Sequence, residues 1–267
     1  MGFKVKPSNK KIIAIGTVHI DPFIESRLEA AIARHRPKQI TLEVMKSQID
    51  TPKNPMWLAS LVTDFIKIFP ADGPHIDAFI EAARPYGAEI YKVREIAARY
   101  GIPIHPVDSK HTRSDMPPKG IEEEFELMKS KRIEVTEKQE QFYRRLYELE
   151  DILGLKRKVD RSTRDRFLFA TTLSVTPKEE WEEVIDFTYY MTRISITKDG
   201  MRDARQADRI LKVWNTTDGN IMHIGGASHL FSTGYNVYEW LVDFGLNIER
   251  KMLGMYDKNY SANKTPL

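Results

Sequence analysis

Short apolar runs alternate with longer segments of helical periodicity in the first hundred residues of the chain. The runs rich in β-branched residues, each of which predicts a strand, are residues 11–15, 39–44 and 102–107. The segments with apolar residues at helical intervals are residues 22–35, 56–69 and 76–100, the last expected to bend near Pro85. Strands that alternate with helices predict an α/β fold with a mostly parallel sheet and helices on both faces.

The pattern changes between about residues 120 and 200. This stretch is rich in Glu, Lys and Arg, keeps helical spacing and contains no convincing strand. Strand-like runs return at 220–224 and 247–253, with a helical segment at 235–244 between them. We therefore expect residues 1–267 to form a single α/β domain with a large helical insertion at 120–200. The insertion would serve either as a cap over a crevice or as an interface between copies of the chain, and the cap is the preferred interpretation.

Composition narrows the classes of function. The chain has 267 residues with 41 Lys and Arg against 38 Asp and Glu, and the basic residues are dispersed among acids, which argues against a dedicated nucleic-acid binder. There is no cysteine, so any metal has to be held by His, Asp or Glu. No run approaches the roughly 18 apolar residues of a membrane span. We expect a cytoplasmic protein without a membrane span.

Two strand-like runs are each followed by the pattern Gly-x-x-His. The first is Gly16 to His19, and the second is Gly226 to His229. Functional residues of open α/β sheets gather at the carboxyl ends of the strands. A glycine would let the chain turn sharply off each strand, so that the two histidines meet over one sheet edge if their strands are neighbours.

Carboxylates are expected at the same edge. Glu43 ends the second strand-like run and Asp108 ends the third. Two imidazoles with one or two carboxylates are able to hold a divalent metal, or to activate water without one. His223 lies inside a strand-like run, where a buried structural histidine is the simpler interpretation, and it is left out of the metal set.

These residues carry a resemblance to a known group of proteins. The two Gly-x-x-His motifs, the acidic Glu43 after the second strand, Met201-Arg202-Asp203 and Val107-Asp108 followed by Thr112-Arg113 resemble the TraB/PrgY, GumN and Tiki superfamily. The resemblance extends from about residue 11 to residue 253. It implies the fold shared by erythromycin esterase-like and ChaN-like proteins.

For the Tiki branch, the resemblance implies a metal-dependent peptidase. His19, Glu43 and His229 would then form the centre and hold manganese or cobalt, with zinc as a further candidate, and the metal would activate water. Arg202 would bind an oxyanion or a substrate carboxylate. Asp108, Arg113, Gly16 and Gly226 would lie around this centre. The expected substrate is a peptide or a small ester.

Two other functions remain open at this point. One is a non-enzymatic protein that sequesters a peptide signal or binds haem. The other is an esterase in which a histidine activates water with no metal.

Overall fold

The computed structural model describes residues 10–49, 55–68, 72–85, 87–108, 121–130, 132, 134–153, 161–191, 200–232 and 234–256. Arg113, which the sequence placed near the site, lies outside the described residues.

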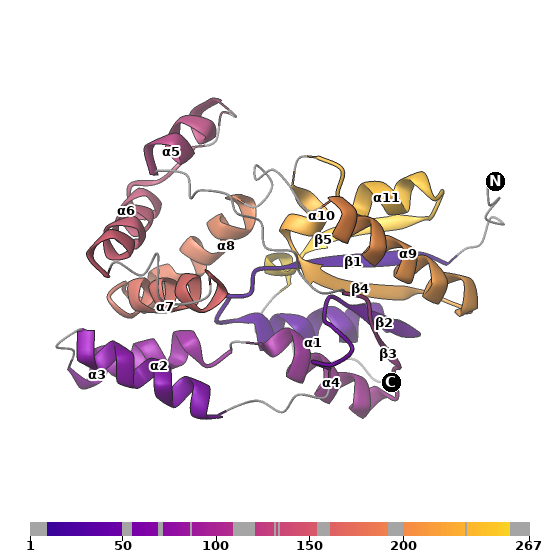
Figure 1. Ribbon diagram of the computed structural model, residues 1–267, viewed down its shortest axis with the longest axis horizontal. Helices are drawn as coiled ribbons and strands as arrows, with labels where there is room; N and C mark the ends of the chain where they lie inside the picture. The colour runs from indigo at the N-terminus through magenta and orange to yellow at the C-terminus, as the bar shows by residue number, and fades with distance from the viewer. Residues whose placement is uncertain are drawn as a thin grey trace.

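Five parallel strands of the described residues form one sheet (Figure 1). They are β1 (Ile12–Thr17), β2 (Gln39–Leu42), β3 (Ile104–Pro106), β4 (Ile221–Gly226) and β5 (Ile248–Met252). Their order is β3-β2-β4-β1-β5, so β4 lies between β1 and β2. All five were expected from the sequence, and the parallel α/β fold is confirmed.

Helices cover both faces of the sheet because its central strands are apolar on both sides. In β1, Ile13 and Ile15 pack in one hydrophobic core, while Ile12 and Ala14, which point the other way, pack in a second. The first core contains α1 (Ile24–His35) and α4 (Ala88–Tyr100), and the second contains α9 (Gly200–Thr216) and α11 (Val237–Asp243). Figure 1 shows these pairs on opposite faces.

A helical region lies beyond the carboxyl ends of the strands (Figure 1). Its helices are α2 (Pro55–Ile68), α3 (Gly73–Ala83), α5 (Ile121–Ser130), α6 (Glu137–Leu153), α7 (Arg161–Ser174) and α8 (Trp181–Met191), the last preceded by the 3₁₀ turn η2 (Lys178–Glu180). In the predicted stretch at 120–200, every secondary-structure element of the described residues is a helix, and turns or irregular residues lie between them. The predicted helix at 76–100 is divided between α3 and α4, which flank the expected bend near Pro85.

Two helices from before residue 120 lie beside the stretch predicted as an insertion. Phe65 of α2 stacks on Phe79 of α3 with ring centroids 4.2 Å apart, and Phe79 meets Phe167 of α7 edge-on at 5.8 Å. Helix α2 therefore packs on α3, and α3 packs on α7. Helical periodicity predicts that a helix forms but does not say against which layer its apolar face packs.

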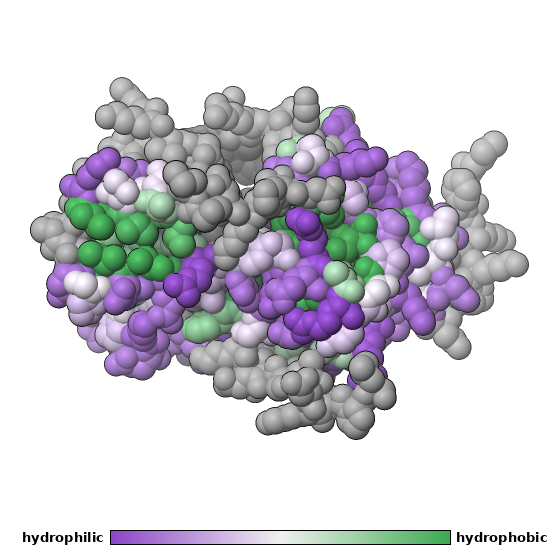
Figure 2. All heavy atoms as spheres, turned by 90° about the horizontal axis from the view of Figure 1, so that it is seen from below, coloured by the Kyte–Doolittle hydropathy of each residue, from purple (hydrophilic) through white to green (hydrophobic). Residues whose placement is uncertain are grey.

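Apolar residues also gather on the outer surface of this region. Figure 2 shows them at the left, over α2 and α3, where Ile66 is 49% exposed.

Among the described residues, no helix has the length and apolar character needed to cross a bilayer. Whether the helical region acts as a cap or as an interface between copies stays a prediction.

Candidate active site

The topology brings the two Gly-x-x-His segments to the same sheet edge. In the register of β1 and β4, Gly16 pairs with Gly225 and Thr17 with Gly226. His19 follows β1 by two residues, and His229 lies in the short helix α10 (Ser228–Phe231) directly after β4. The histidines therefore leave neighbouring parallel strands at the same end.

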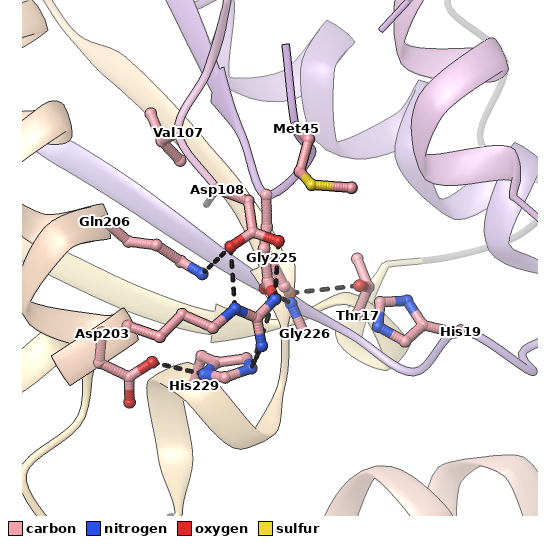
Figure 3. Close-up of polar contacts among 12 residues, drawn as sticks. Thr17, His19, Met45, Val107, Asp108, Asp203, Gln206, Gly225, Gly226 and His229 are labelled. Carbon is pink, nitrogen blue, oxygen red and sulfur yellow. Dashed lines mark hydrogen bonds and ion pairs between the residues drawn. The ribbon is translucent and has the colours of Figure 1, made fainter. Parts of the chain in front are cut away.

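Three of the predicted residues converge around Gly226. A methyl group built on this glycine would lie 3.4 Å from His19 Nε2, 3.5 Å from Glu43 Oε2 and 3.5 Å from His229 Cδ2. Figure 3 shows His229 on one side of Gly226 and His19 on the other. Glu43 lies just beyond β2, and its Oε2 accepts a hydrogen bond from the Gly226 N–H at 2.6 Å.

The glycines do not act as the sequence argument expected. Gly16 and Gly226 lie inside β1 and β4, and neither has a positive φ, so they do not turn the chain off the strand. They permit close approach instead. A Cβ on Gly16 would lie 2.9 Å from the ring of Phe231 in α10. The absence of side chains at these positions lets α10 and the histidines approach the ends of the strands.

Arg202 of α9 joins the carboxylates of the site. Its Nε and Nη2 each donate to Asp108 at 2.8 Å, and Nη2 also donates to Glu43 Oε1 at 2.7 Å. Nη1 lies 3.0 Å from His229 Nε2. The side chains of Arg202, Glu43 and Asp108 are 11%, 7% and 4% exposed. Because a buried charge is costly unless it is paired, this arrangement fixes all three groups. The resemblance implies that Arg202 binds an oxyanion or a substrate carboxylate. In this structure its guanidinium bonds to the carboxylates of Glu43 and Asp108 instead.

Each histidine is held by a carboxylate at Nδ1. His229 Nδ1 lies 2.6 Å from Asp203 Oδ1, and His19 Nδ1 bonds with Glu89 Oε1 in the first turn of α4. Such a pair fixes the orientation of the imidazole and directs its Nε2 to the other side. In this site, both rings meet the position of Gly226.

Sequence reasoning did not assign roles to these two carboxylates. Asp203 was noted only as the neighbour of Arg202. Glu89 gave no signal, because an acidic residue in the first turn of a helix is common for local reasons.

The charges of the site shift the pKa values of its groups. Burial alone would raise the pKa of Glu43, but His229, Arg202 and His19, with the Gly226 N–H, lower it to about 2. Burial acts to lower the pKa of His229, but Glu43 and Asp203 outweigh it and raise the value to about 9. When protonated, Nε2 faces Glu43 Oε1 at 3.3 Å; when neutral, it accepts from Arg202. His229 therefore has a partner for Nε2 in either state.

His223 lies in the core beside this site, as expected, and outside the converging set. Burial lowers its pKa to about 4, so the ring is neutral at pH 7. Its Nδ1 lies 3.1 Å from Thr41 Oγ1, while Nε2 has no hydrogen-bond partner among the described residues.

The segment that carries His19 is fastened to the helical region. Asp21 is buried, pairs with Arg27 of α1 at 3.0 Å and accepts from Tyr189 Oη of α8 at 2.7 Å. Arg27 also donates to Asp186 of α8 at 3.0 Å. Because Asp21 follows His19 by two residues, this cluster limits the movement of the loop.

The donor set of His19, Glu43 and His229 does not fit the divalent metal that the resemblance implies. Both carboxylate oxygens of Glu43 already accept hydrogen bonds, and Arg202 occupies the side of Glu43 Oε1 and of His229 Nε2. A metal at these atoms would lie against a guanidinium, and like charges repel strongly where burial limits screening. Among the residues that the structure describes, no group of three His, Asp or Glu side chains is arranged for a metal. As arranged, the residues are paired with Arg202 and do not fit a divalent metal as well.

Comparisons of the chain with models of protein families, with curated proteins and with solved structures find no match. The resemblance to the TraB and Tiki superfamily therefore stays a prediction.

The raised pKa of His229 predicts a dependence of stability on pH. A group whose pKa rises from 6.5 to about 9 on folding contributes stability that is complete below pH 6.5 and disappears as the pH rises through 9. We expect the difference in free energy of unfolding between the wild type and His229→Gln to shrink by on the order of 3 kcal/mol between pH 6.5 and 10. Urea unfolding across this range measures it, and a constant difference would contradict the assignment.

Gly225 and Gly226 are adjacent in β4, but alanine at the two positions should lower the free energy of unfolding by different amounts. A Cβ on Gly225 would lie 2.9 Å from both Glu43 Oε2 and His223 Nε2, which are buried and unable to yield. We expect Gly225→Ala to lower the free energy of unfolding by about 1–3 kcal/mol. The methyl group of Gly226→Ala would lie 3.4 Å or more from its neighbours, so this variant should lower the free energy of unfolding much less. Thermal unfolding of the two variants checks this order, and equal losses would refute it.

Proposed function

We propose that this protein is a hydrolase that uses His19 to activate water at the carboxyl edge of the sheet. The observation that carries the proposal is the convergence of His19 Nε2, Glu43 and His229 at Gly226, with Arg202 buried beside them. A carboxylate-oriented histidine beside fixed positive charge is an arrangement suited to attack by water on a carbonyl group.

His19 is the group best placed to meet a substrate. Its side chain is 52% exposed, whereas that of His229 is 13% exposed. Glu89 holds Nδ1, so Nε2 is the nitrogen that would accept a proton from water. The substrate would therefore approach from the His19 side of Gly226.

The proposed reaction uses these groups in order. His19 Nε2 takes a proton from water while the water oxygen bonds to the carbonyl carbon, and the carbonyl π electrons move to its oxygen. The positive charges of Arg202 and the His229 imidazolium stabilise that oxyanion. When the oxyanion collapses, the bond to the leaving oxygen or nitrogen breaks, and His229 Nε2–H supplies its proton. Transfer of the proton from His19 back to His229 through water completes the cycle.

The proposed substrates are small esters or peptides, as the resemblance implies. Hydrolysis of p-nitrophenyl acetate and of labelled unfolded casein tests this, each assayed with EDTA and with added Mn²⁺. We expect turnover of at least one substrate that depends on His19. Turnover equal to the buffer rate for both, or equal in the wild type and His19→Gln, would overturn the proposal.

A further inference from the structure

Arg202 lies where a metal ion would bind the same ligands. Its Nη2 lies 2.7 Å from Glu43 Oε1 and 2.8 Å from Asp108 Oδ2. Nη1 lies 3.0 Å from His229 Nε2. Two carboxylates and one imidazole are a ligand set that Mn²⁺ and Zn²⁺ accept at distances of about 2.0–2.2 Å. The guanidinium thus lies among three potential ligands, of which Glu43 Oε1 and His229 Nε2 are 3.3 Å apart.

Other residues hold these ligands in place without Arg202. Gly226 N–H donates to Glu43, Gln206 donates to Asp108 Oδ1 at 3.2 Å, and Asp203 holds His229 Nδ1. A carboxylate on the far nitrogen of a ligating histidine is the support that metal sites commonly use. The surrounding residues therefore already have the arrangement of a metal site.

We propose that Arg202 is the built-in cation of this site, that it excludes a divalent metal, and that removing its side chain leaves a site for Mn²⁺ or Zn²⁺ on Glu43, Asp108 and His229. Without the guanidinium, two buried carboxylates lose the positive charge that bonds to both of them, and a divalent cation would replace it. The inference specifies the cation of the proposed hydrolase, but it concerns binding and does not depend on turnover.

Calorimetric titration with MnCl₂ and with ZnCl₂ at pH 7, without substrate, tests the proposal on three proteins. The wild type should bind neither metal at this site. Arg202→Ala should bind one equivalent at least about tenfold more tightly than the wild type, and its melting temperature should rise with the metal. Adding Asp108→Asn to Arg202→Ala removes a ligand. It should weaken metal binding by more than the roughly 10- to 100-fold that is typical when a residue supporting a ligand is lost.

Two results would overturn the proposal. One is a stoichiometric metal in the wild type that His229→Gln removes. The other is an Arg202→Ala variant that binds metal no more tightly than the wild type. If Arg202→Ala does not fold, the wild-type titration still decides whether the native site excludes metal. Because no arm measures hydrolysis, the result stands whether or not the proposed reaction is found.

Discussion

Replacing Arg202 by methionine is expected to lower the free energy of unfolding by about 3–5 kcal/mol. The side chains of Glu43 and Asp108 are 7% and 4% exposed, and both bond to the guanidinium. Removing it leaves two negative charges with little access to water. Urea unfolding at pH 7 in EDTA measures the loss, because the chelator prevents a metal from replacing the missing charge.

A matched control on the same helix separates burial from charge. Lys212 pairs with Asp208 at 2.7 Å, and both side chains are exposed. Lys212→Met should lower the free energy of unfolding by no more than about 0.5 kcal/mol. The double variant Arg202→Met/Asp108→Asn should lower the free energy of unfolding by less than the sum of its single variants, because the second change removes one of the two negative charges that had bonded to the guanidinium. Equal effects of Arg202→Met and Lys212→Met would show that Arg202 does not hold the site together.

His19→Gln is expected to lower kcat for hydrolysis by about 10²–10⁴-fold. Glutamine fills a similar space but cannot accept the proton from water at the position of Nε2 as a base. The half-exposed side chain makes little packing contribution, so the melting temperature should change little. Glu89→Gln should produce a smaller loss of kcat, because it weakens the orientation of His19 and leaves the imidazole in place.

His75 provides a control for this prediction. Its Nδ1 lies 2.5 Å from Asp72 Oδ1, so it is also an exposed imidazole held by a carboxylate, but in α3 of the helical region. His75→Gln should leave kcat unchanged. Similar losses in His19→Gln and His75→Gln would indicate that neither ring is specific to the reaction.

Much of the framework could be predicted from the sequence because it depends on local patterns. Apolar runs located the five strands, and the rule that parallel strands present their carboxyl ends at one edge predicted that His19 and His229 meet. That prediction required β1 and β4 to be neighbours, and the sequence did not determine the strand order. Local sequence does not determine whether β4 pairs with β1, and the register between them exists only in the folded sheet.

The partners of the site residues could not be predicted for the same reason. Arg202 appears in the sequence as one charged residue on an amphipathic helix, and only the packing of α9 against the sheet brings it to Glu43 and Asp108. Glu89 reaches His19 through the packing of α4 under the sheet edge. Likewise, the apolar faces of α2 and α3 did not reveal that α2 would pack on α3 and α3 on α7.

The rate of hydrolysis by Gly226→Ala tests the central claim most directly, because this variant adds one methyl group where His19, Glu43 and His229 meet. The account predicts that kcat/KM falls by at least about tenfold, since the methyl group would fill the space beside His19 Nε2 that the attacking water and the carbonyl group need, while the melting temperature stays close to that of the wild type. An unchanged kcat/KM would contradict the claim that these residues form one hydrolytic centre.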